Sequence, residues 1–178
     1  MRRCRAEIRD AVAAFCAARP VGARFVHCAA DGPAGSSPSM KWVNPPVAFM
    51  LHAGVPLLLD VGTHLPGLQA GDPARAAREG YPGLLARAVP GTPSYKSDDG
   101  PKQTPECLIA RIDLVDALDQ GRTRLKLTHA QREALIADAR RDRLDAVLCL
   151  MQAAWASQRP DHGLPAAIDP REGWILTA

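Results

Sequence analysis

The chain has 178 residues, of which 47% are hydrophobic, so it is long enough for one core and we expect a single domain spanning residues 1–178. Its formal net charge of +3 is too small to demand a nucleic-acid partner, and its aromatic content of 4% argues against a dedicated platform for stacking single strands. Five scattered cysteines without a Cys-x-x-Cys pair argue against a zinc or redox site. No apolar run approaches the roughly 18 residues of a membrane span. We therefore expect a reduced, cytoplasmic protein with no membrane partner.

The N-terminal part of the sequence predicts a helix, a strand and a loop. Apolar residues at helical spacing predict a helix from about Ala6 to Ala18, which Pro20 ends. The stretch "ARFVHCAAD" (23–31) predicts a short strand. Residues 32–46 are dense in Gly, Ser and Pro and predict a long loop. The loop does not match the P-loop pattern, so its amides around Gly35 either hold an anion or belong to an ordinary packed loop.

The central part is apolar and interrupted by proline. The stretch "PPVAFMLHAGVPLLLDVG" (45–62) predicts two short buried segments, more typical of helices than of strands, that separate at Gly54 to Pro56. A turn is expected at residues 71–73, followed by a short segment that reaches Glu79. Tyr81 precedes a proline, which biases it towards extended geometry, and the same proline suits the first turn of a helix. Glu79 is therefore predicted to lie at a strand-to-helix junction.

The C-terminal part predicts three helices and a final strand. Thr104 is expected to cap a helix that reaches about Leu118, with proline at its first position. Thr128 begins a capping-box pattern for a second helix. A single helix from there to residue 158 would exceed the usual globular length, so we expect a break near residues 139–142 before the third helix. Residues 174–177 are expected to form a short strand.

The third of these helices opens with two acids and carries a polar stripe. Asp142, Asp145, Cys149, Gln152 and Ala156 follow spacings of three and four and so share one narrow face, while the remaining residues predict burial on most other sides. In one interpretation the stripe meets water at its acidic end, where the helix dipole stabilises each carboxylate by about 0.3 to 1 kcal/mol. In the other, the stripe borders a cleft and the carboxylates hold a divalent metal ion.

The metal interpretation needs acids from more than one element. Mg²⁺ prefers oxygen ligands and usually keeps several waters, so one or two carboxylates and the phosphate oxygens of a substrate complete its shell. Two such ions can activate water and stabilise the leaving oxygen in phosphodiester cleavage. Asp145 on a late helix and Glu79 at a strand end are suitable in type.

Four stretches of the sequence resemble a known family. "REGYPGLLAR", "SYKSDDGPKQTPE", "RLDAVLCLMQAAWA" and "DPREGWILTA" occur in the same order as in domain-of-unknown-function family 429, a group predicted to be nucleases of ribonuclease H-like fold. The likeness covers most of the chain. It implies that Glu79 and Asp145 are catalytic carboxylates that bind Mg²⁺ or Mn²⁺, with Asp142 as an accessory metal ligand. It also implies an α/β fold, rich in helix, with a small sheet.

The chain departs from that family at its N-terminus. In the ribonuclease H-like fold an Asp on the first strand is the central metal ligand, whereas this chain is predicted to begin with a helix. We therefore expect the C-terminal portion of an incomplete ribonuclease H-like domain, whose missing first strands leave a sheet edge exposed. "LLLDVGTH" around Asp60 imitates such a strand, although no hairpin follows it. Lys96 and Lys102 either bind substrate phosphates or belong to a solvated loop.

Two hypotheses follow. The first is a metal-dependent nuclease that hydrolyses phosphodiesters, either active or inactive as this chain, with nucleic acid as its partner. The second is a non-catalytic remnant that acts in protein association or forms a homo-oligomer through the exposed sheet edge.

Overall fold

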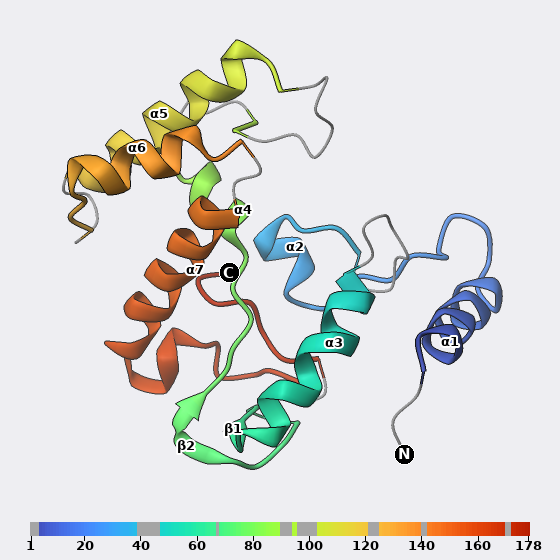
Figure 1. Cartoon of the computed structure of the whole chain (residues 1–178). Helices are drawn as coiled ribbons and strands as arrows, with labels where there is room; N and C mark the ends of the chain where they lie inside the picture. Colours follow the sequence, from blue (N-terminus) through green and yellow to red (C-terminus); the bar gives the residue numbers. More distant parts are fainter. Residues whose placement is uncertain are drawn as a thin grey trace. The chain divides into compact units, whose positions relative to one another are not determined.

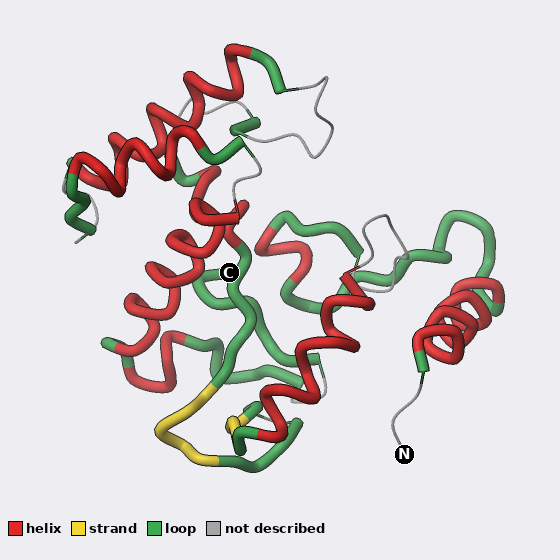
Figure 2. The backbone as a smooth tube through the Cα atoms, viewed as in Figure 1, coloured by secondary structure: helices red, strands yellow, loops and turns green. Residues whose placement is uncertain are grey.

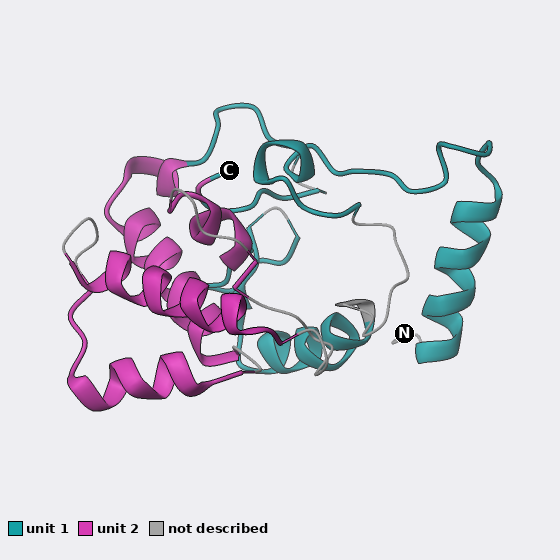
Figure 3. Cartoon of the chain, turned by 90° about the horizontal axis from the view of Figure 1, so that it is seen from above, with its two compact units in different colours: residues 1–79, 164–176, 178 teal, residues 80–163, 177 magenta. Residues whose placement is uncertain are grey.

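The computed structural model divides the chain into two compact units, which are coloured separately in Figure 3. Unit 1 comprises residues 1–79, 164–176 and 178, and unit 2 comprises residues 80–163 and 177. The described residues are 4–38, 47–66, 68–89, 94–95, 103–120, 125–139, 142–169 and 172–178. Among them, no helix combines the length and the apolar character that crossing a lipid bilayer requires.

Unit 1 begins with the predicted helix. α1 spans Arg5–Ala17 (Figure 1), and its first turn is closed by a capping box in which the backbone N–H of Cys4 donates to the Glu7 carboxylate over 2.6 Å. The helix has no buried residue. The Arg5 guanidinium lies 5.0 Å from the centroid of the Phe49 ring on α3, which gives α1 a cation–π contact with the rest of unit 1.

The strand expected at residues 23–31 is absent. Residues 23–30 are irregular, and Asp31–Ala34 form the short helix α2. The backbone N–H groups around this point bond locally: that of Asp31 donates to the Cys28 carbonyl, and that of Cys28 donates to the Asp31 carboxylate. An Asp side chain that satisfies the backbone within its own turn competes with strand pairing, which explains the error. Residues 39–46, the rest of the expected loop, lie outside the described residues.

The apolar central stretch forms one exposed helix rather than two buried segments. α3 spans Val47–Asp60 and continues through Pro56. Asp60 therefore ends a helix, and the suggestion that it ends a first strand is wrong. Proline removes one backbone donor, and here the helix persists in spite of that loss. Several of its apolar side chains are largely exposed, namely Met50 (67%), Leu51 (58%) and Leu57 (67%).

A small parallel sheet follows α3. β1 (Thr63–His64) pairs with β2 (Asp72–Ala76), and all five residues of β2 are exposed. Asp72 begins β2 where the turn at 71–73 was expected, and a turn precedes the strand, where the amide of Leu68 donates to the Leu65 carbonyl. The prediction of a helix-rich α/β chain with a small sheet is confirmed (Figure 2). The ribonuclease H-like arrangement stays a prediction.

Unit 2 is helical, and its local signals were predicted correctly. α4 (Pro82–Arg87) follows Tyr81, which is extended at φ −123° and ψ 99°, and has proline in its first turn. α5 (Pro105–Asp119) has Thr104 at its N-cap position, although the Thr104 side chain makes no capping hydrogen bond, and α6 (His129–Ala137) has both hydrogen bonds of the predicted capping box. The break precedes α7 (Asp142–Ser157), after which comes the 3₁₀ helix η2 (Pro160–Gly163).

A hydrophobic core lies within unit 2. Its buried members come from α4 to α7 and the segment before α5: Ala86, Tyr95, Ala110, Leu114, Val115, Leu118, Leu135, Leu144 and Leu148. α7 is not buried on most sides, because Leu150 is 62% exposed and Ala154 is also exposed. The expectation of burial on most sides of α7 is therefore wrong, since apolar composition shows which residues can be buried but not whether another element covers them.

Gly71 offers a test of the sheet. A Cβ at this position would lie 2.5 Å from the backbone carbonyl of Thr63, so Gly71→Ala must push β1 and β2 apart. We expect a local destabilisation of about 1 to 3 kcal/mol, measured as faster hydrogen exchange of the Ala77 amide, which bonds to the His64 carbonyl. Gly54→Ala is the matched control, because nothing lies within 4 Å of a Cβ there. Equal exchange rates in both variants would contradict the prediction.

Candidate functional site

The C-terminal segment brings two distant parts of unit 1 together. Glu79 forms a parallel bridge with Ile175, and its carbonyl accepts a hydrogen bond of 2.9 Å from the Leu176 amide. The Glu172 carboxylate accepts a bond of 3.0 Å from the Ala29 amide, close to the start of α2. Ile175 and Leu176 are buried, which anchors the segment. One short stretch of chain thus contacts both the turn before α2 and the extended residue before unit 2.

Asp31 is the buried acid of this region. It is 4% exposed, and its two carboxylate oxygens accept bonds from the Ser36 hydroxyl (2.6 Å) and the Cys28 amide (2.7 Å). The His27 Nδ1 atom lies 3.8 Å from the same carboxylate. A buried carboxylate needs such donors to offset its lost hydration. The Asp31 side chain is therefore held in place by its own turn.

Glu79 is electrostatically coupled to that acid. Burial of its carboxyl group and the negative charge of Asp31 both raise the pKa of Glu79, although the residue as a whole is exposed. Two carboxylates that disfavour each other's ionised form are characteristic of functional sites, where a cation or a shared proton relieves the repulsion. The predicted junction for Glu79 is confirmed, since its bridge precedes α4 by only a few residues.

The second predicted carboxylate has a structural partner in unit 2. Asp145 is half-buried on α7, and its Oδ1 atom accepts a bond of 2.8 Å from the hydroxyl of the buried Tyr95. Asp142 is exposed. Glu79 lies in unit 1 and both aspartates lie in unit 2, so their meeting at one metal ion stays a prediction.

The rest of the α7 stripe does not meet water. Gln152 and Ala156 are buried, and the Gln152 amide donates to the Thr177 hydroxyl over 2.8 Å. A Cβ on Gly80 would lie 3.3 Å from both the Cys149 sulfur and the Gln152 side-chain oxygen, so the main chain passes close to this face. The solvent interpretation holds at the acidic end of the stripe and is wrong for its other end.

The described start of the loop after α2, residues 35–38, forms local backbone hydrogen bonds. The amides of Gly35 and Ser36 donate to the carbonyls of Gly32 and Asp31, so these two N–H groups are already used in hydrogen bonds and do not point to an anion site. Lys96 and Lys102, the candidate phosphate ligands, lie outside the described residues. Asp31 itself was missed because an Asp before Gly and Pro is typical of a turn, and nothing local reveals its approach to Glu79.

The described residues offer few side-chain ligands for a divalent metal ion. They contain no group of three or more His, Cys, Asp or Glu side chains placed to hold a metal ion. Two carboxylates are sufficient for Mg²⁺ when water and substrate phosphate complete the shell. Asp31 and Glu79 come from segments that are distant in the chain, and the charge of Asp31 acts on Glu79.

The pKa of Glu79 predicts a pH dependence. A raised pKa means that the native chain binds this proton more tightly than the unfolded chain, so the contribution of Glu79 to stability is lost as pH rises from about 4.5 through its native value. Glu79→Gln should therefore raise the thermal midpoint near pH 7 and change it less near pH 4. Circular dichroism melting curves at the two pH values would measure the difference.

Glu106 provides a control of opposite sign. Hydrogen bonds from the Thr104 side chain and from its own backbone lower the pKa of Glu106. Its stabilisation is present above the unfolded pKa and is lost as pH falls, so Glu106→Gln should lower the midpoint near neutral pH. Shifts of the same sign in both variants would contradict the assignment.

The bond between Tyr95 and Asp145 predicts a stability loss. Tyr95→Phe removes the hydroxyl and leaves a half-buried carboxylate with one donor fewer, so we expect a loss of roughly 1 to 2 kcal/mol in the free energy of unfolding. Urea denaturation would measure it. Tyr81→Phe is the control, expected to change the free energy by less than about 0.5 kcal/mol. Equal losses in the two variants would show that the bond to Asp145 contributes little.

Comparison with known proteins supplies no independent support for a family or a function. No family model, no curated protein and no solved structure matches the chain. The resemblance to domain-of-unknown-function family 429 therefore stays an expectation from the four motifs, and the site is defined by the contacts of Asp31, Glu79 and the C-terminal segment.

Proposed function

We propose that the chain is a metal-dependent phosphodiesterase of ribonuclease H-like type that acts on nucleic acid. In this proposal Asp31 and Glu79 hold Mg²⁺ or Mn²⁺. One observation supports it: burial of its carboxyl group and, to a smaller extent, the charge of Asp31 raise the pKa of Glu79, so these two acids from distant segments interact electrostatically. Asp145, with Asp142 as its accessory, remains a candidate for the same ion.

The two carboxylates have complementary roles. Asp31 is oriented by the Cys28 amide and the Ser36 hydroxyl, so it would hold the ion at a fixed position. Glu79 is exposed to solvent while its backbone is tied to Leu176, so it can meet a substrate that approaches from water. When bound, the ion would supply charge stabilisation at the phosphate and lower the pKa of a water ligand.

A second candidate function is self-association without catalysis. Its support is exposed surface in unit 1. Every residue of β2 is exposed, and α3 presents the apolar side chains of Met50, Leu51 and Leu57 to solvent. An exposed strand and an apolar helix face are both surfaces that proteins commonly cover with a partner.

Metal binding distinguishes the two functions. Titration of the full chain with Mn²⁺, followed by electron paramagnetic resonance, should show binding that Glu79→Gln weakens by about tenfold or more, because a ligand carboxylate is lost. The same protein should cleave DNA, RNA or bis(p-nitrophenyl) phosphate in Mg²⁺ or Mn²⁺, and Glu79→Gln should abolish cleavage.

Asp10→Asn is the matched control, an exposed acid of α1 that lies in unit 1 and away from the pair. It should leave Mn²⁺ affinity and cleavage unchanged. If no phosphodiester is cleaved and Glu79→Gln binds Mn²⁺ as the wild type does, the catalytic proposal is lost. A dimer in sedimentation that ignores metal would then favour self-association. Asp145→Asn tests whether the acid of unit 2 joins the site.

A further inference from the structure

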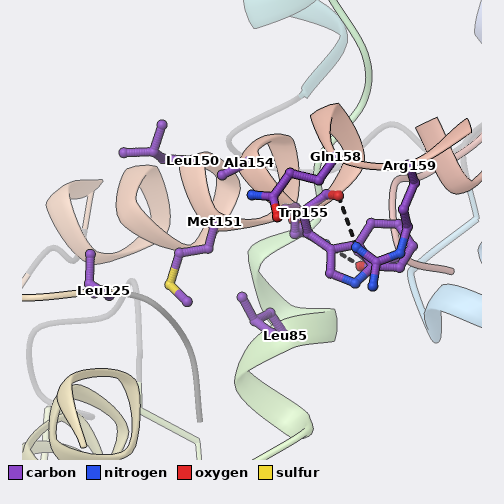
Figure 4. Close-up of a pocket in the computed structure, with 10 residues that line it drawn as sticks. Leu85, Leu125, Leu150, Met151, Ala154, Trp155, Gln158 and Arg159 are labelled. Carbon is purple, nitrogen blue, oxygen red and sulfur yellow. Dashed lines mark hydrogen bonds between the residues drawn. The ribbon is translucent and has the colours of Figure 1, made fainter. Parts of the chain in front are cut away.

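A pocket of about 760 Å³ lies within unit 2, along the outer side of α7 (Figure 4). Its apolar wall is formed by Leu150, Met151 and Trp155 of α7, with Leu85 of α4 and Leu125. The volume falls within the roughly 300 to 1,000 Å³ typical of small-molecule sites. Leu85, Leu125 and Met151 of this wall also pack against the core of unit 2, whereas Leu150 is 62% exposed.

The polar end of the pocket is cationic. Among the described lining residues Arg159 is the charged one, and its guanidinium carbon lies 3.7 Å from the centroid of the Trp155 ring (Figure 4). One of its nitrogens donates to the Trp155 carbonyl over 3.0 Å. A guanidinium carries five N–H donors in a fixed fork, so a single hydrogen bond leaves donors that an anion can use.

The Trp155 ring also lies close to η2. Gly163 of η2 adopts a φ of +69°, and a Cβ there would lie 2.6 Å from the Trp155 ring carbons. Only glycine permits this contact at this backbone conformation. The ring thus contacts both the Arg159 guanidinium and the backbone of η2, which holds it in place in the pocket wall.

We propose that this pocket binds a small organic anion with a flat apolar body, such as an aromatic carboxylate or sulfonate. The apolar part of the ligand contacts Leu85, Met151 and Trp155, and its anionic group meets Arg159. Charge complementarity argues for this occupant, because the described lining combines apolar surface with a single cationic side chain. The site lies in unit 2 and uses neither Asp31 nor Glu79, so it stands independently of the proposed catalysis.

Two naphthalene probes test the proposal. The full chain is labelled with ¹³C at its methionine methyl groups, and the probes are 2-naphthalenesulfonate and the neutral 2-naphthol. The Met151 methyl signal should shift saturably with the sulfonate, whereas that of Met50, which is exposed on α3, should not move. Met151→Leu and Met50→Leu assign the two signals.

Two variant pairs give the expected changes. Arg159→Gln should weaken sulfonate binding by about fivefold or more and leave naphthol binding within about twofold, because only the sulfonate uses the guanidinium. Its control is Arg19→Gln, which removes a similar cation–π contact at 3.8 Å from the Phe15 ring in unit 1. Ala154→Trp should block both probes by filling the pocket, while Ala153→Trp, exposed on the same helix but outside the lining, should not.

Three results would overturn the proposal. One is an unmoved Met151 signal at millimolar probe. Another is parallel shifts of Met151 and Met50, which indicate nonspecific adsorption. The third is equal sulfonate affinity in Arg159→Gln and the wild type, which would show that Arg159 does not bind the anionic group of the ligand.

Discussion

The pairing of the C-terminal segment with Glu79 is the constraint on which unit 1 depends. The bridge between Glu79 and Ile175 and the bond from Ala29 to Glu172 join the segment before unit 2 to the turn that opens α2. Neither α1 nor β2 contributes a buried residue, so few other buried contacts organise this unit. The electrostatic coupling of the two candidate carboxylates is a consequence of this pairing rather than of any local motif.

Unit 2 is organised differently, by a hydrophobic core. α7 has three faces with different surroundings. Leu144 and Leu148 are fully buried in the core, the stripe that includes Gln152 is covered by nearby main chain, and the third face lines a pocket. This division explains how one helix can be strongly apolar and still half exposed. Asp145 lies beside the core, where its carboxylate accepts a hydrogen bond from the Tyr95 hydroxyl.

The three acids of interest differ in how the chain compensates their charge. Asp31 accepts hydrogen bonds from the Ser36 hydroxyl and the Cys28 amide, and Asp145 accepts one from the Tyr95 hydroxyl. Glu79 is destabilised in its ionised form by burial and by the charge of Asp31. Such a carboxylate gains from a nearby cation or a proton. The motif resemblance predicted Glu79, together with Asp145, as a metal ligand, and that role stays a prediction.

The sequence by itself determined the features that depend on neighbouring residues: the capping box at Thr128, the proline start of α4 after an extended Tyr81, and the break before α7. These follow from backbone dihedral preferences and hydrogen bonds that span a few residues. Only the tertiary structure decided that α3 stays exposed and that Asp31 lies within electrostatic reach of Glu79. Burial and the approach of distant charges depend on which segments cover one another, and no local pattern encodes that choice.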